Sequence, residues 1–186
     1  MQPLAHNDLL QTLTEVSAAF VGFSMLANAL RSSRGDELMR FMNYRDVAEI
    51  GLIGVLGSLA PLLLYSFGWP EETAWRWSSA IFGAAHIVGA FASGRRRNRT
   101  IFAEDEQSMV QFLVSNPLRV VPAFSCLAVV FVLAITNTVA PGPLSGARHV
   151  SAVAISLGIA GWFFLFAAFG PHSAASPRPG NGSTAK

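Results

Sequence analysis

The stretch TLTEVSAAFVGFSMLANAL, residues 12–30, is apolar except near its beginning, where it carries Glu15. An apolar run of this length is typical of a signal peptide, a buried core helix or a membrane span, and the class of the protein depends on which one it is. A signal peptide has basic residues before its apolar run. Residues 1–14 contain no Lys or Arg, whereas Arg31 and Arg34 follow the run. This charge distribution favours a membrane span.

The composition of the whole chain also indicates a membrane protein. Of its 186 residues, 52% are hydrophobic and only 13% are charged, whereas average soluble chains carry about 25% charged residues. The mean hydropathy is +0.43. The net charge of +2 is too small to suggest nucleic-acid binding, and one cysteine, Cys126, excludes an internal disulfide.

Five apolar runs come close to the ~20 residues that a helix needs to cross a bilayer. They cover residues 10–30, 47–67, 74–92, 120–139 and 150–169. We therefore expect an all-α fold, an integral membrane bundle of five transmembrane helices over residues 1–170. The first run begins with several polar residues, so the alternative is four spans plus one surface helix.

The basic residues predict the orientation of the chain. Arginines are concentrated between runs one and two and between runs three and four, while the opposite side holds only Arg76 and Arg148. With five spans every basic cluster lies on one side, and the positive-inside rule makes that side cytoplasmic. We expect a multi-pass protein of the cell (inner) membrane, with its N-terminus outside and its C-terminus in the cytoplasm.

Two segments outside the spans have distinct patterns. Residues 101–116 mix three acidic residues with an apolar set, which predicts an amphipathic helix on the cytoplasmic surface. Residues 171–186 are rich in Pro, Gly and Ser, which predicts a disordered cytoplasmic tail.

Ionisable side chains inside a bilayer are costly, so each is a functional candidate. Glu15 lies one to two turns into the first run, with Gln11 on the same helical face. It either faces a polar crevice that binds a cation or relays a proton, or it lies solvated among lipid headgroups. His86, near the centre of the third run, is either a buried neutral histidine bonded to a carbonyl or hydroxyl, or a proton relay or ligand.

Polar residues at the ends of two other runs complete the candidate set. Asn137 ends the fourth run and would build an outer polar site with Glu15 if the two lay side by side. The second run opens with Arg45, Asp46 and Glu49. Arg45 and Glu49 stand at i and i+4 and are expected to pair in a cytoplasmic-interface ion network, or to form the inner gate of a pathway.

Cofactor and enzyme signals are missing from the sequence. We expect His6, His149 and His172 outside the spans, so that His86 has no partner for haem ligation. No Cys and His spacing matches a zinc site, and we expect no metal and no cofactor. Nucleotide-binding, serine-hydrolase and metalloprotease motifs do not occur, so the chain is not expected to be an enzyme.

Small residues recur at helical spacing in several runs, as at Gly51, Gly54 and Gly57 of the second. Such residues let membrane helices approach closely. Two interpretations stay open: tight packing within one chain, or an interface, most simply on the second run, with a second copy or another membrane protein.

The first run has the pattern E-x-x-x-x-F/V-x-G-F, from Glu15 to Gly22 and Phe23, and the second run contains Pro61. In these features the chain resembles small, uncharacterised bacterial multi-pass membrane proteins, a likeness that implies no known activity. Residues 17–27, SAAFVGFSMLA, are also similar to the pore-lining first helix of the Orai calcium channels. The N-terminus of those channels is cytoplasmic, which is the reverse of the orientation expected here.

Two functions are compatible with these patterns. The first is a small permeation protein for cations or protons, in which Glu15 and His86 lie on a common path. The second is a non-catalytic membrane sensor, scaffold or accessory subunit, in which these residues are dispersed.

Overall fold

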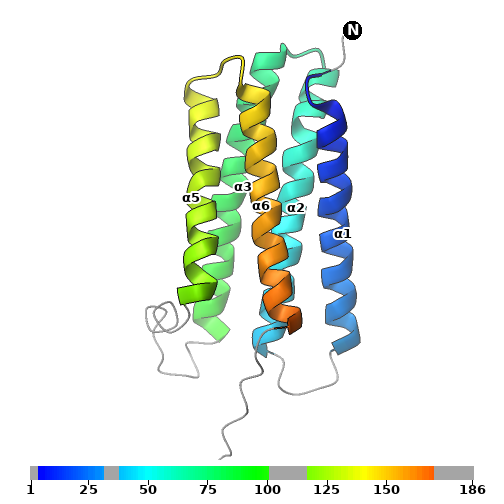
Figure 1. The fold of residues 1–186 in the computed structure, drawn as a ribbon, viewed down its shortest axis with the longest axis vertical. Helices are drawn as coiled ribbons and strands as arrows, with labels where there is room; N and C mark the ends of the chain where they lie inside the picture. The colour runs from blue at the N-terminus through cyan, green and yellow to red at the C-terminus, as the bar shows by residue number, and fades with distance from the viewer. Residues whose placement is uncertain (1–3, 32–37, 101–116, 170–186) are drawn as a thin grey trace, which may run out of the picture.

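The computed structural model describes residues 4–31, 38–100 and 117–169. These ranges form five helices and contain no strand, which confirms the all-α fold. The helices are α1 (Asn7–Arg31), α2 (Leu38–Ser66), α3 (Glu71–Thr100), α5 (Pro117–Val139) and α6 (Ser145–Phe169). Figure 1 shows them side by side along the long axis of the molecule. The end at which α1 begins is called the upper end here, and the opposite end the lower end.

The helices are those of a membrane protein. Four of them, α1, α2, α5 and α6, are long and apolar enough to cross a bilayer. α3 is more polar, but its 30 residues exceed the ~20 that a span requires, and it runs the length of the bundle beside α2 and α5 (Figure 1). The chain therefore folds as a helical membrane bundle. α1 runs along the bundle, so the first run is not the surface helix of the alternative expectation.

Four of the helices form a closed ring. α2 packs against α3, α3 against α5, α5 against α6, and α6 against α2. Successive helices alternate in direction (Figure 1), and short described connections join α2 to α3 and α5 to α6. Between α2 and α3 the turn uses Gly68, whose φ of +84° lies in the left-handed region that glycine adopts without steric cost. α1 lies outside the ring, against α2 and α6.

The glycines of α2 bring its neighbours close. A side-chain carbon added at Gly54 would lie 2.6 Å from Ser17 Oγ of α1, and one at Gly51 would lie 2.9 Å from Val21 Cγ2. At Gly57 the added carbon would lie 2.5 Å from the ring of Phe82 in α3. These three glycines are therefore used for packing within one molecule, and the second run does not offer them to a partner.

The centre of the ring is a tightly packed apolar cluster contributed by α3, α5 and α6. Its fully or almost fully buried members are Phe82, Val130, Ala152, Val153 and Leu157. The predicted amphipathic segment 101–116 and the predicted tail 171–186 lie outside the described residues, so both stay predictions.

Candidate functional site

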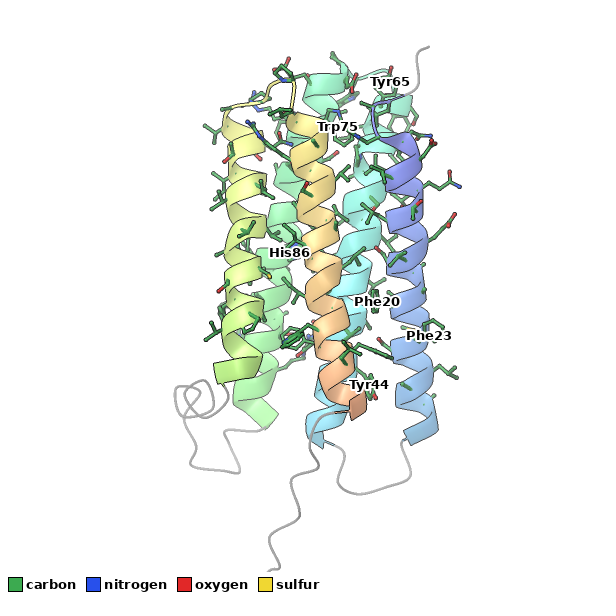
Figure 2. The ribbon with its side chains drawn as sticks, viewed as in Figure 1. Phe20, Phe23, Tyr44, Tyr65, Trp75 and His86 are labelled. Atoms are coloured by element: carbon green, nitrogen blue, oxygen red, sulfur yellow. The ribbon has the colours of Figure 1, made fainter. Side chains whose placement is uncertain are left out.

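One face of α3 carries three buried residues in line. Ser79, Phe82 and His86 are three and four residues apart, a spacing that places them on the same side of a helix. Their side chains point into the ring of α2, α3, α5 and α6, where Ser79 and His86 contact residues of α6. His86 lies near the middle of the bundle in Figure 2. The most polar helix thus directs its polar side chains to the interior and away from lipid.

The upper polar cluster is centred on His149 of α6, which is 2% exposed. Its Nδ1 lies 2.9 Å from Ser79 Oγ, and its Nε2 lies 2.8 Å from the carbonyl oxygen of Gly57 in α2. Because a carbonyl only accepts, Nε2 carries the hydrogen and Nδ1 accepts from the Ser79 hydroxyl. The imidazole of His149 therefore links α6 to both α2 and α3 by hydrogen bonds.

Asn137 of α5 completes the upper cluster. Its Nδ2 donates to Ser79 Oγ at 2.8 Å and to the carbonyl oxygen of Ser145 at 2.9 Å. Its Oδ1 is buried and has no hydrogen-bond partner among the described residues. All four helices of the ring thus meet in one hydrogen-bonded chain, which runs from Asn137 through Ser79 and His149 to Gly57.

The lower polar cluster is centred on His86. Its Nδ1 lies 3.0 Å from the carbonyl oxygen of Phe82, and its Nε2 lies 2.8 Å from Ser156 Oγ of α6. His86 thus has the burial and the contacts of the first of its two alternatives, and a relay role stays a prediction. The hydrogen is on Nδ1 here, so the two histidines are opposite tautomers.

Phe82 separates the two clusters. It is fully buried, and its ring centroid lies 4.5 Å from that of His86 and 5.8 Å from that of His149. Ser79 and His86 are seven residues apart, about 10 Å along the helix at 1.5 Å per residue. A single aromatic ring therefore occupies the space between two polar groups that together cover the middle of the bundle.

Each cluster lies next to a cavity that begins at the nearer end of the molecule. A cavity of about 220 Å³ between the ring helices is lined at its lower end by Asp46, Glu49 and Ser93 and, further in, by His86 and Ser156. Its remaining walls are mostly apolar, formed by residues such as Ile53, Leu127 and Ile159.

A second cavity, of about 430 Å³, lies at the upper end and is lined by His6, Glu71, Glu72 and Trp75. Trp75 is almost fully buried, near the upper end in Figure 2, and its ring centroid lies 5.6 Å from that of His149. The indole N–H donates to Glu71 Oε1 at 3.2 Å. Trp75 is therefore the wall between the upper cavity and the His149 cluster.

The predicted ion network is present at the lower end. Arg45 Nε lies 3.3 Å from Glu49 Oε1, as the i, i+4 spacing predicts. Glu49 also pairs with Arg96 of α3, and the Ser93 hydroxyl bonds the carboxylates of Asp46 and Glu49 at 3.0 and 3.1 Å. The network joins α2 to α3 and surrounds the mouth of the lower cavity.

Glu15 does not belong to this set of interior residues. It lies on the exposed side of α1, where Gln11 Nε2 donates to its Oε1 at 3.4 Å. α1 and α5 lie at opposite edges of the bundle, and Asn137 bonds Ser79 and Ser145 (Figure 1). The condition for an outer polar site of Glu15 and Asn137, that the two residues lie side by side, is therefore not met.

The position of His149 is a second correction. The sequence placed it just before the fifth apolar run, but α6 begins at Ser145 and its candidate span, Ser145–Leu165, includes His149. The helix begins at Ser145, whose hydroxyl accepts from Gly142 N–H at 2.8 Å in the turn before α6. His86 is therefore one of two histidines inside the bundle.

Within the described ranges, no group of three or more His, Cys, Asp or Glu residues is arranged to hold a metal ion. No protein-family model matches the chain, and no curated protein or solved structure matches it either. Function is therefore inferred from the buried polar clusters and the two cavities alone.

Proposed function

We propose that the protein conducts protons through the interior of the α2, α3, α5 and α6 ring, with His86 and His149 as relay groups and Phe82 as the closure between them. The observation that supports this most is the arrangement of the two histidines along one axis. His86 lines the lower cavity, and His149 packs against Trp75, which lines the upper cavity.

The polar groups at the cavity mouths suit proton entry and exit. Carboxylates line both mouths, Asp46 and Glu49 below and Glu71 and Glu72 above. Carboxylates and histidines in series are the usual components of proton relays in membrane proteins. Between the cavities, the hydroxyls of Ser79 and Ser156 each contact a ring nitrogen and can pass a proton to it.

The arrangement described here is a closed one. The phenyl ring of Phe82, which lies between the two histidines, has no polar atom, so a proton passes only when this ring moves. The buried histidines and the cavity-lining carboxylates then form a gated pathway for protons. The phenyl ring of Phe82 closes this pathway to larger hydrated cations.

The orientation in the membrane belongs to this proposal. The positive-inside rule places the arginine-rich lower end in the cytoplasm of a cell whose inner membrane holds the protein, with the N-terminus outside. The lower cavity then opens to the cytoplasm and the upper cavity to the exterior. The proposed activity is permeation and not enzymatic catalysis.

One observation favours the second candidate function, a non-catalytic sensor, scaffold or accessory subunit. Both nitrogens of each histidine already have a hydrogen-bond partner. Fully bonded polar clusters fix the relative positions of membrane helices without any transport. The two candidates differ in what happens when the closure is removed.

Proton flux into liposomes that enclose a pH-sensitive dye tests the proposal. Purified protein is reconstituted, a potassium diffusion potential is applied, and the initial rate of internal pH change is measured. We expect Phe82→Ala to raise the rate severalfold over the wild type, and the double variant Phe82→Ala with His149→Gln to lose that increase. Phe91→Ala, on the exposed side of the same helix, is the matched control and should leave the rate unchanged.

Folding is checked by monodispersity and by a melting temperature above that of the assay. If Phe82→Ala does not fold, Phe82→Leu replaces it, because leucine keeps most of the apolar volume and removes the ring. A folded Phe82 variant that gives only the rate of empty liposomes contradicts proton conduction and leaves the non-catalytic role.

A further inference from the structure

The exposed side of α1 differs from the exposed sides of the other helices. The outward residues of α2, α3 and α5 are largely bulky and apolar, as at Leu52, Val88 and Val132. α1 also exposes bulky apolar residues such as Phe23 and Met25, but it presents in addition an outer strip, which we call the α1 face, that combines two polar residues with small ones. Its members, all exposed, are Gln11, Glu15, Ala18 and Gly22.

The depth of Glu15 follows from the packing of α1 on α2. Ser17 lies against Gly54, since a side-chain carbon there would be 2.6 Å from Ser17 Oγ. Gly54 is near the middle of the apolar span Tyr44–Ser66. Glu15 is two residues from Ser17, about 3 Å along the helix at 1.5 Å per residue. Glu15 therefore lies close to the mid-depth of the bilayer and not among the headgroups.

Glu15 also points away from the rest of the molecule. At 100° per residue it lies on nearly the opposite side of α1 from Ser17, which faces α2. Its hydrogen bond from Gln11 is long at 3.4 Å, and a carboxyl group has several further acceptor positions. A carboxyl group at this depth is costly when lipid surrounds it. A protein partner that covers the α1 face would therefore lower the cost of placing Glu15 at this depth.

We propose that a second copy of this chain covers the α1 face, in a two-fold dimer in which the two α1 helices run parallel. Both copies have the same orientation in the membrane, so their α1 helices enter from the same side. A two-fold contact requires a face that is complementary to itself. The α1 face meets this requirement, because it carries the Gln11 amide, which donates and accepts, next to the Glu15 carboxyl.

The small residues set the contact distance. Ala18 and Gly22 are four residues apart on the α1 face, the spacing at which small residues let two membrane helices approach closely. At Gly22 no atom of the described chain lies within 4 Å of an added side-chain carbon, so this position is open in the single molecule. In the dimer, Gln11 of each copy bonds Glu15 of the other, about two turns above the closest approach.

The inference is independent of proton conduction, and a pair of exposed glycines provides its test. Gly22 and Gly158 both have nothing within 4 Å of an added side chain, and both are exposed. Purified chains labelled with donor and acceptor dyes are reconstituted in liposomes, and energy transfer is followed as lipid dilutes the protein. We expect Gly22→Leu to weaken self-association about tenfold or more, and Gly158→Leu to leave it at the wild-type level.

Two further variants test the polar contact. Glu15→Leu should weaken association, while Glu15→Gln, which keeps hydrogen-bonding capacity, should retain most of it. Thermal unfolding of each variant at high dilution checks that the single molecule is unaffected. Wild-type protein that stays monomeric at high density contradicts the proposal. So does equal weakening by Gly22→Leu and Gly158→Leu, or a Glu15→Leu variant that associates as well as the wild type.

Discussion

α1 and α3 place polar side chains at mid-membrane in opposite ways. α3 is the helix that falls short of the apolar character of a typical span, yet its Ser79 and His86 are buried and bonded inside the ring. α1 is apolar enough to span, but its Glu15 lies on the exposed side, where its hydrogen-bond partner among the described residues is Gln11 of the same helix. The mean polarity of a helix therefore does not predict whether it lies at the centre or at the edge of this bundle.

The difference follows from what each helix contacts. α3 packs against α2, α5 and α6, so a polar group on its inner face finds partners on three other helices. α1 packs against α2 and α6 on one side only. A polar group on the other side of α1 faces no neighbouring helix of the described chain, and the hydrocarbon of a bilayer has no hydrogen-bonding groups. The comparison implies that inward positions of α3 dominate folding stability, while outward positions of α1 dominate association.

The largest effect is expected at the centre of α3. Phe82→Ala removes a fully buried ring that touches both histidines, and we expect it to lower the free energy of unfolding by about 3–5 kcal/mol, the usual cost of such a truncation. Phe91→Ala, at a position that is 66% exposed, should cost less than about 1 kcal/mol. Unfolding in mixed detergent micelles with increasing SDS measures both. Equal losses would show that inward and outward positions of α3 are equivalent.

A smaller effect separates two adjacent buried serines of α3. Ser79 accepts from Asn137 and donates to His149, whereas the Ser78 hydroxyl has no partner within the described part of the chain. We expect Ser79→Ala to cost about 1–3 kcal/mol, because it leaves two buried polar groups without their bond. Ser78→Ala should be neutral or slightly stabilising. The same unfolding measurement distinguishes them, and a Ser78 loss as large as that of Ser79 would contradict the hydrogen-bonded axis.

The length and spacing of the apolar runs were enough to predict a helical membrane bundle, since a span needs a fixed number of residues. Local pairs were predictable as well. Arg45 and Glu49 stand one turn apart on α2 and are bonded as expected, and His86 bonds the carbonyl of Phe82 one turn before it. These contacts depend only on helix periodicity.

Partners distant in the sequence were beyond the same reasoning. His149 bonds Ser79, 70 residues away, and Gly57, 92 residues away. Which helix faces which depends on the packing of small residues such as Gly57 against Phe82, and one sequence does not reveal the order of helices around a ring. For the same reason the sequence left open whether Glu15 and Asn137 lie side by side, and their helices, α1 and α5, lie at opposite edges of the bundle (Figure 1).

The smallest effect concerns the lower end of α3, where its polar side chains reach water. Arg96 pairs there with Glu49 of α2, and their side chains are 36% and 25% exposed. Solvent screens such a pair, so a double-mutant cycle with Glu49→Gln and Arg96→Gln should give a coupling of at most about 1 kcal/mol. The cycle isolates this pair from the other contacts that Glu49 makes with Arg45 and Ser93. The coupling should also fall as salt is raised from 0.05 to about 1 M, because the Debye length shortens to ~3 Å. A larger coupling that does not depend on salt would mean that the Arg96 and Glu49 pair is as shielded from solvent as the hydrogen bond between Ser79 and His149. The interior and the lower end of α3 would then not differ in solvent exposure.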